Sequence, residues 1–417
     1  MAYSWTLSLG FEPVDWSVSA DEWLHCLAVC NSESDSDVRF AGHRADATTQ
    51  PFIEVTGERP DRSHPDTVLL LLPTDEGLEV LIGGHEEEVD EGIVAMWATA
   101  VQCATSRLGK MSHEFEWTAI IGTPAEGRFG GRFALGAGAR IGPFELTPGG
   151  RPLTQMARNT AGPSLSTASV RHSWPVLVRS RHVGFNWPSA QKRASFELRR
   201  LCALLSLDSD YHSWSVLEAP TPLGMGERRI PESGHPAYSP MPTGHFAEPP
   251  SEPESLWQPS SWVTKAWDEM ARHPWLAHAV IIHHEGQLLD DEHPSLALVA
   301  YVSSIEAISN RLFEDRRCET CGSHLYVAAR FRETLALVVG GNQLARLATA
   351  YGDRSTSVHQ GRLHGSDSAP GSWGIIWNDP ERTFDLQVVL GMRAASKALL
   401  VLAFSDGLPP RRTLPGS

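Results

Sequence analysis

A stretch rich in Pro, Gly, Ser and Glu between Pro220 and Pro259 divides this 417-residue sequence into two parts of different character. Such a composition carries little hydrophobic periodicity and is typical of a linker or an extended surface segment. β-rich segments punctuated by glycine precede it, and long segments with helical periodicity follow it. We therefore predict an α+β chain: a mixed, β-rich domain at residues 1–220, a linker at 221–253 and an all-α bundle at 254–417.

In the first part, helical periodicity predicts three helices, at residues 20–30, 93–106 and 188–207. Two β-rich runs, 67–73 and 78–83, flank a short turn and predict a hairpin. Further short strands follow, separated by glycines whose spacing does not fit a dinucleotide loop and which we interpret as turn residues. In the second part, five helices are predicted, at residues 262–289, 295–313, 325–339, 343–359 and 380–404. Helices of this length and number form a bundle.

Several polar residues are interpreted as structural and not functional. Arg199 and Arg200 lie at the polar edge of the helix predicted at 188–207, which favours a solvated face. The His283-His284-Glu285 run stands at a predicted helix end, where a solvated cluster is favoured over a metal site. Cys26 and Cys30 fall on one helical face, a spacing that favours a core position.

The formal net charge of −15 limits the partners that the chain can bind. About −12 of it precedes residue 254 and about −3 follows, so RNA contact needs a local Arg cluster or a partner chain. An acidic balance also disfavours anionic membranes. We find no signal peptide and no transmembrane span, and predict a cytoplasmic protein with no membrane contact, whose 6 Cys are mostly reduced.

The sequence from Tyr351 to Gly361 places Arg354 and His359 five positions apart near the end of a predicted helix. Both side chains can point into one cleft if the helix end tightens or a neighbouring chain completes the site. His titrates near neutral pH and can act as acid or base, whereas Arg presents a charged fork that matches phosphate oxygens. The structural alternative is an Arg paired with a carboxylate such as Glu306 and a His that caps helical carbonyls.

The same string resembles the ApeA-like branch of the HEPN domain family, which carries Tyr-x-x-Arg-Ser-x-x-Val-His-x-Gly. The matching positions are Tyr351, Arg354, Ser355, Val358, His359 and Gly361. The family also carries a Glu followed after three residues by a Lys-Arg pair, and here Glu306 is followed by Asn310, in place of the Lys, and Arg311. The resemblance covers about residues 255–410. It implies a HEPN-like bundle with a catalytic pair, Arg354 and His359, and supporting residues Glu306, Asn310, Arg311, Ser355 and Tyr351.

The resemblance implies a metal-independent endoribonuclease that requires no cofactor. RNA supplies its own nucleophile, the 2′-hydroxyl, so such an enzyme needs a base, an acid and positive charge on the phosphate. In the family, two protomers bring their motifs together, which implies a homodimer. The RNA could be tRNA, and the role is in antiphage or toxin-type defence. The first domain would then act as a sensor or regulator for a phage-derived or other protein trigger.

Two questions stay open at this stage. Cys318-x-x-Cys321 has the knuckle spacing of a zinc site, to which His324 or a second chain could add ligands; otherwise it is a turn with reduced thiols. The alternative to the nuclease is a non-catalytic HEPN-like protein that dimerises or binds a ligand. A nuclease depends on both Arg354 and His359, whereas a scaffold tolerates the loss of either.

Overall fold

The computed structural model combines helices and sheets, in agreement with the predicted α+β class. It describes residues 2–9, 16–33, 39–46, 52–58, 67–74, 77–84, 91–110, 112–124, 133–150, 153–157, 169–209, 213–223, 253, 255–290, 293–315, 317, 321, 326–352, 380–405 and 407–414. The chain divides into two compact units, unit 1 (1–115 and 183–190) and unit 2 (116–182 and 191–417). This division differs from the predicted boundaries, because the second sheet belongs to the same unit as the helices.

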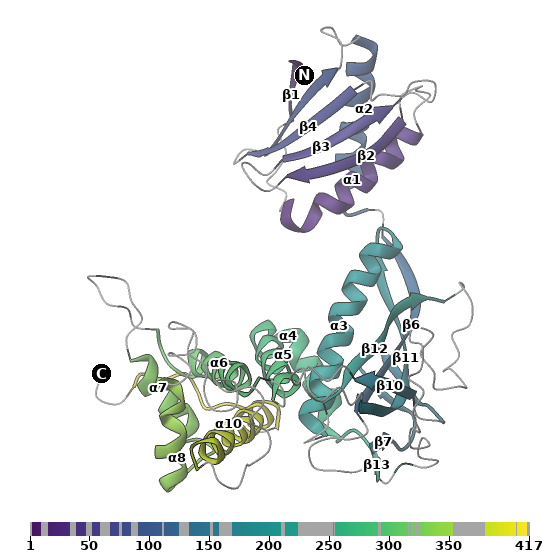
Figure 1. Cartoon of the computed structure of the whole chain (residues 1–417). Coiled ribbons are helices and arrows are strands. Elements are labelled where there is room, and N and C mark those ends of the chain that lie inside the picture. Colours follow the sequence, from purple (N-terminus) through teal and green to yellow (C-terminus); the bar gives the residue numbers. More distant parts are fainter. Residues whose placement is uncertain are drawn as a thin grey trace. The chain divides into compact units, whose positions relative to one another are not determined.

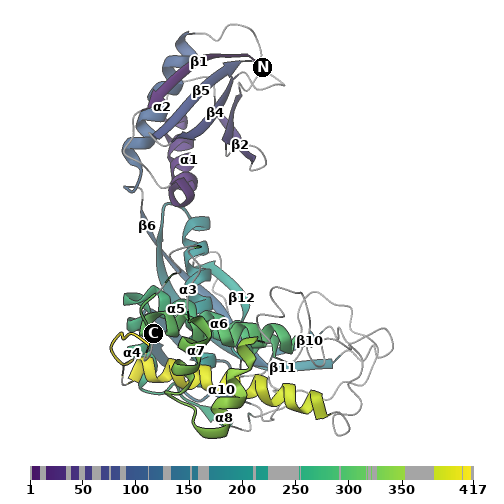
Figure 2. The same ribbon diagram turned by 90° about the vertical axis from the view of Figure 1, so that its left-hand side faces the viewer.

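Unit 1 is an antiparallel sheet of five strands with two helices on one face (Figures 1 and 2). The strand order is β1-β5-β4-β3-β2. The strands are β1 (Ala2–Leu9), β2 (Arg39–Asp46), β3 (Phe52–Glu58), β4 (Thr67–Thr74) and β5 (Gly77–Gly84). The helices are α1 (Trp16–Ser32) and α2 (Glu91–Arg107). The predicted hairpin is confirmed as β4 and β5, which pair in antiparallel register across their whole length.

The core of unit 1 lies between this sheet and the two helices. Trp23 and Leu27 of α1, Trp97 of α2, and Leu69 and Val80 of the sheet are at most 1% exposed. The buried aromatic and aliphatic surface is the main source of stability for such a two-layer arrangement. The helices predicted at 20–30 and 93–106 are confirmed as α1 and α2, each longer than predicted.

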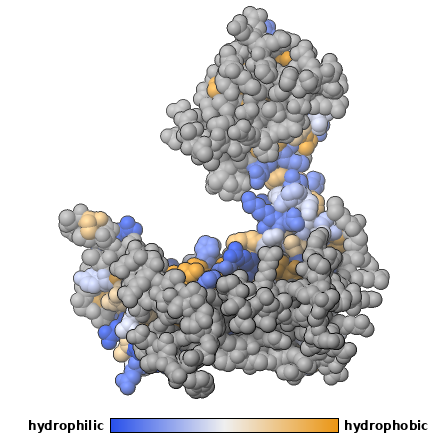
Figure 3. Space-filling view, in the orientation of Figure 1, coloured by the Kyte–Doolittle hydropathy of each residue, from blue (hydrophilic) through white to orange (hydrophobic). Residues whose placement is uncertain are grey.

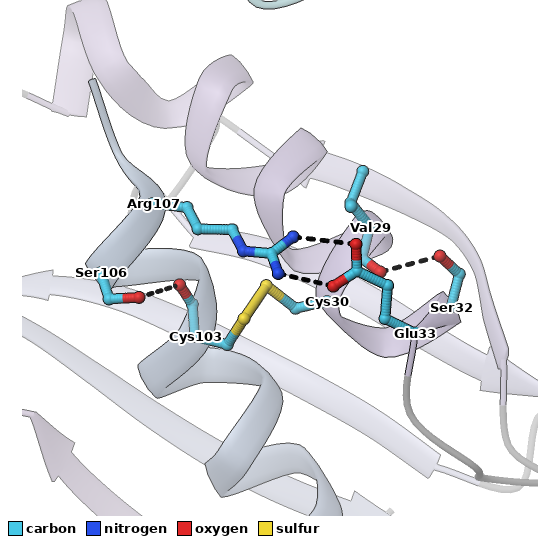
Figure 4. A network of polar contacts seen from close by, with 7 residues as sticks. All are labelled: Val29, Cys30, Ser32, Glu33, Cys103, Ser106 and Arg107. Atoms are coloured by element: carbon cyan, nitrogen blue, oxygen red, sulfur yellow. Dashed lines mark hydrogen bonds and ion pairs between the residues drawn. A yellow bond between two sulfur atoms is a disulfide. The ribbon is translucent and has the colours of Figure 1, made fainter. Parts of the chain in front are cut away.

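A disulfide and an ion pair join the C-terminal ends of α1 and α2 (Figure 4). A disulfide connects Cys30 to Cys103 across 73 positions of sequence, with the Cα atoms 6.1 Å apart. One helical turn further, Arg107 donates two hydrogen bonds to Glu33, at 3.1 and 2.6 Å, which lowers the pKa of the Glu33 carboxyl. Cys26 is a buried thiol, as predicted, but the prediction of reduced cysteines is wrong for this pair.

Unit 2 contains a second sheet, of strand order β12-β6-β11-β9-β8, in which β10 also pairs with β11. The strands are β6 (His113–Pro124), β8 (Ala139–Ile141), β9 (Phe144–Pro148), β10 (Leu153–Ala157), β11 (Ser169–Gly184) and β12 (Ser215–Pro222). Two further strands form a parallel pair: β7 (Phe133–Leu135) and β13 (Ser255–Trp257). Because β13 follows the predicted linker, the chain returns to pair with a strand of the first part before the helices begin.

Helix α3 (Trp187–Asp208) confirms the strongest helix prediction of the first part. Of the apolar stripe predicted for it, Leu198, Leu201, Leu204 and Leu205 are buried, whereas Phe196 is 51% exposed. The solvated interpretation of Arg200 is wrong: its side chain is 9% exposed, pairs with Glu197 at 2.7 Å and lies over the ring of a tryptophan in the next helix. The periodicity of one helix cannot predict this burial, because the ring that covers Arg200 comes from a distant part of the sequence.

Trp267 of the next helix, α4 (Trp262–Arg272), joins the sheet to the helical part. Its ring lies edge-on to Phe144 of β9 at 5.0 Å, and the Arg200 guanidinium lies 5.0 Å over it. The turn between β8 and β9 contributes Gly142 (φ +52°), where an added Cβ would lie 2.3 Å from Trp267. The prediction that this glycine belongs to a turn is confirmed, and the close approach explains why no side chain fits.

The helical part comprises α4 (Trp262–Arg272), α5 (Pro274–Leu289), α6 (Pro294–Leu312), α7 (Val327–Leu335), α8 (Gly341–Ala348) and α10 (Pro380–Ser405). The single helix predicted at 262–289 is two, because Pro274 lacks an N–H and starts a new helix after His273. The predicted helix at 295–313 is confirmed as α6 and that at 380–404 as α10. The predicted helix at 343–359 lies partly outside the described residues.

Helix α10 contains a segment, 387–405, that is long and apolar enough to cross a membrane by length and composition, whereas no such span was predicted from the sequence. This segment packs against α4, α5 and α6, and it carries Arg393 and the fully buried Ser396 on its inner side. Because a bundle's central helix passes the same test, we interpret it as the core of the bundle.

Candidate functional site

Helix α6 carries the first group of residues that the sequence predicts to support catalysis. Glu306 is half-buried, and Asn310 and Arg311 are exposed in the last helical turn. The apolar positions of α6, including Tyr301, Ile305 and Ile308, are 0% exposed and set the orientation of the helix. The buried positions of α6 therefore leave Arg311 on the solvent side of the bundle.

The string that carries the family resemblance starts directly after α8. Tyr351 is half-buried, and its ring contacts Phe331 of α7, with the centroids 5.3 Å apart. Gly352 closes a turn by donating its N–H to the carbonyl of Thr349 at 2.9 Å. Arg354, Ser355 and His359 lie outside the described residues. The structure thus places Tyr351 in the α7–α8 layer, and the catalytic pair remains a prediction.

The candidate zinc ligands are described only in part. Cys321 is an exposed cysteine outside any disulfide, and Cys318 and His324 lie outside the described residues. Within the part of the chain that the structure describes, no three His, Cys, Asp or Glu side chains gather as a metal site would require. Zinc at Cys318 and Cys321 therefore stays a prediction.

The helices around α6 are joined by a buried polar network that the sequence did not predict. His283 of α5 contacts Ser396 of α10 (Nδ1 to Oγ, 2.9 Å), and Ser396 bonds Ser304 of α6 (3.1 Å). Ser304 in turn donates to the carbonyl of Ala279 on α5 at 2.9 Å. His283, Ser304 and Ser396 are each 0% exposed. This network fixes α5, α6 and α10 against one another. Its member on α6, Ser304, lies two residues before Glu306.

The solvated interpretation of His283 and His284 is therefore wrong, since they are 0% and 2% exposed. Burial lowers the pKa of His283 to about 3, with the positive charge of Arg393 adding to the effect, and burial lowers the pKa of His284 to about 4. Both imidazoles are neutral at pH 7. The prediction fails because it assumed that a helix end is solvated, whereas Ser396 of α10 and Tyr301 of α6 cover His283.

A buried ion pair extends this network. Arg393 of α10 donates to Asp290, at the end of α5, at 2.9 Å, and the two side chains are 13% and 5% exposed. Breaking such a pair leaves an uncompensated charge in the interior and costs about 3–5 kcal/mol. The ion pair and the hydroxyl network therefore connect α5 to α10 at two positions along the helices.

The contact of His283 with Ser396 has the composition of a base and a nucleophile, but its burial excludes a catalytic role. A substrate must reach the serine oxygen, and Ser396 is 0% exposed at the centre of the bundle. The role of the network is therefore structural: it fixes the positions of α6 and α10 in the bundle. Its sequence signal was small polar residues, Ser304 and Ser396, standing inside apolar helical stripes.

Comparison with models of known protein families, with curated proteins and with solved structures found no match for this chain.

Proposed function

We propose that this chain is a metal-independent endoribonuclease of the HEPN type, acting through Arg354 and His359. The observation that supports the proposal is the position of the string that begins at Tyr351. It follows α8 directly, in a bundle whose α6 exposes Arg311 at its end. The predicted pair would then stand at a helix end, as the resemblance requires, and α6 would supply the nearby positive charge.

The chemistry follows from the two side chains. The imidazole of His359 takes the proton of the RNA 2′-hydroxyl, and the 2′-oxygen attacks the adjacent phosphorus. The bond from phosphorus to the 5′-oxygen breaks, and that oxygen takes a proton from the protonated imidazole of the partner subunit's His359. Arg354 bonds the phosphate oxygens, where charge develops. The products are a 2′,3′-cyclic phosphate and a 5′-hydroxyl.

The proposal includes a homodimer, because one Arg and one His per chain supply either the base or the acid but hardly both. It also includes a cytoplasmic location, a role in antiphage or toxin-type defence, and tRNA as a candidate substrate. These elements rest on the family resemblance. In a reducing cytoplasm, the Cys30–Cys103 pair would be open for part of the time, so the redox state belongs among the test conditions.

The test is cleavage of total RNA and of tRNA by the purified full chain in the presence of EDTA. We expect fragments with 5′-hydroxyl ends, identified by direct labelling with polynucleotide kinase without phosphatase treatment. His359→Ala and Arg354→Ala should abolish them. The matched control is His278→Ala, which removes an exposed histidine of α5. Cleavage that needs a divalent metal, or that survives both substitutions, would contradict the proposal and favour the non-catalytic alternative.

The regulatory role of unit 1 has its own test in the full chain. If unit 1 restrains the nuclease, loosening it should raise the basal activity. Cys103→Ser removes the disulfide between α1 and α2 without touching unit 2. A several-fold increase in RNA cleavage is expected relative to His278→Ala, which changes an exposed side chain of unit 2. Equal activity of the two variants would contradict the restraint.

A further inference from the structure

The described surface of unit 2 points to charge, and not to an apolar face, as the basis of partner binding. Hydrophobic and strongly hydrophilic residues lie next to one another on its visible face (Figure 3). Its large exposed apolar side chains come from different elements: Phe196, Val216, Leu256, Leu288, Leu296 and Tyr326. Single exposed apolar residues of this kind are ordinary on protein surfaces. Arginines also gather around the end of α6, where Arg317, Arg330, Arg411 and Arg412 contact Phe313, Asp315 or Glu333.

The chain segment after α10 returns to this place and is anchored there by its backbone. Gly407 turns the chain with a φ of +78°, and its N–H donates to the carbonyl of Leu402 at 3.0 Å. The N–H of Arg412 donates to the carbonyl of Leu312 at 2.9 Å, and the N–H of Glu314 donates to the carbonyl of Arg412 at 3.2 Å. We call residues 407–414 the tail.

The two arginines of the tail hold the end of α6 while keeping most of their donors exposed. Arg411 bonds the carbonyl of Phe313 through Nε alone, at 3.3 Å, and Arg412 lies with its guanidinium 5.2 Å over the buried ring of Phe313. Both residues are exposed. Capping of helical carbonyls by arginine is common, and it uses a single N–H here. The terminal nitrogens of Arg411 and the edge of Arg412 remain available to a ligand.

Further arginines surround this anchor. Arg311 stands one residue before Leu312, whose carbonyl accepts the tail, and Arg332 lies on α7 next to Glu333, the carboxylate that pairs with Arg412 at 3.9 Å. Arg311 and Arg332 are exposed and form no ion pair with another described residue. A second carboxylate nearby, Asp315, is engaged by two other arginines of the same region, at 3.2 and 3.7 Å. Glu314, beside Asp315, is also exposed, so three carboxylates stand against six arginines among the described residues here: Arg311, Arg317, Arg330, Arg332, Arg411 and Arg412. Positive charge is therefore in excess at this point of an otherwise acidic chain.

We propose that the tail and the end of α6 form a binding surface for the phosphate backbone of single-stranded RNA, through Arg311, Arg332, Arg411 and Arg412. The inference rests on the proposed function for its choice of RNA among polyanions. Planar guanidinium groups with exposed N–H edges match phosphate oxygens in bidentate geometry. Arg311 also belongs to the predicted supporting residues, so the surface would extend from the candidate catalytic region along the bound strand.

The experiment measures binding of a fluorescent, unstructured RNA oligonucleotide to full-length His359→Ala by anisotropy, at salt concentrations from 50 to 300 mM. The test variant adds Arg411→Ala and Arg412→Ala. Each phosphate contact to a single strand contributes about 0.7 to the slope of log affinity against log salt. Two lost contacts should lower the slope by about 1.4 and weaken binding about 25-fold at 0.1 M salt.

Three variants separate charge from folding. Arg140→Ala with Arg272→Ala removes the same number of exposed arginines from β8 and α4 and should bind RNA as His359→Ala does. Arg411→Lys with Arg412→Lys keeps the charge and should bind within a few-fold. Arg332→Glu alters a side chain with no described ion pair, so it should fold normally and still weaken RNA binding.

The outcomes distinguish the two proposals. Equal affinity and equal salt slope for the tail variant and the β8–α4 control would overturn the inference, even if the wild type cleaves RNA. Arginine-dependent RNA binding by a chain that cleaves nothing would support the surface and overturn the nuclease. Absence of RNA binding, or the same arginine dependence for polyglutamate in place of RNA, would also overturn the inference, the latter by identifying an acidic protein as the partner.

Discussion

The buried histidines of α5 should make unit 2 unstable in mild acid. His283 and His284 are neutral in the folded chain, with pKa values lowered to about 3 and about 4 by burial, but titrate near 6.5 when unfolded. Since their folded pKa values are depressed, the stability they contribute is fully present above pH 6.5. It is lost as the pH falls from 6.5 toward 4, because only the unfolded chain takes up protons in that window.

The magnitude follows from the difference in proton binding. At pH 5, each unfolded histidine gains about 2 kcal/mol from protonation, so the pair should cost about 4 kcal/mol of unfolding free energy relative to pH 8. That is a large part of the roughly 5–15 kcal/mol typical of a domain.

The assay is urea unfolding between pH 5 and pH 8, followed by tryptophan fluorescence. Because unfolding of two units can occur in separate steps, the quantity to compare is the change in pH slope caused by substitution. His283→Gln should reduce the slope between pH 6 and pH 5 by about 1 kcal/mol per pH unit. The exposed His278→Gln should leave the slope unchanged. An unchanged slope in His283→Gln would refute the neutral, buried state of this imidazole.

Two further predictions concern stability. Gly142→Ala should lower the unfolding free energy of unit 2 by about 2–4 kcal/mol, because the new methyl group would lie 2.3 Å from Trp267; Gly341→Ala, in the same unit at φ +57° with nothing within 4 Å, should cost only about 1 kcal/mol. Similar unfolding midpoints for the two variants would contradict the close approach. Cys103→Ser should destabilise unit 1 by up to about 4 kcal/mol, because the bond to Cys30 closes a loop spanning 73 positions; reductant should have the same effect on the wild type and none on the variant.

Much of the secondary structure could be predicted, because its signal is local. The apolar stripe of α3 and the hairpin of β4 and β5 were evident from periodicity and turn residues. The break at His273–Pro274 was also local, but the continuous apolar run of α5 concealed it. Local patterns therefore predicted most helices and several strands. They were less reliable for the residues at which an element begins and ends.

The environment of polar residues could not be predicted in the same way, because it depends on distant segments. Arg200 is covered by Trp267, and His283 is covered by Ser396, each partner far away in the sequence. The Cys30–Cys103 pair likewise joins two helices separated by four strands. For the candidate site, the sequence identified α6 and the string after α8, whereas the polar network and the tail required the three-dimensional arrangement.

Unit 1 is made of two separate segments of the chain, and this determines the order in which the chain can complete its folding. Residues 183–190, the end of β11 and the first turn of α3, belong to unit 1 together with residues 1–115, whereas the residues on both sides of 183–190 belong to unit 2. Within this unit, Phe185 contacts His25, and Trp187 contacts Phe115. A ribosome must therefore synthesise the first strands of unit 2 before unit 1 has all its parts. For the same reason, no single cut in the chain releases either unit intact, and any fragment used to study one of them will lack a piece or carry a foreign one.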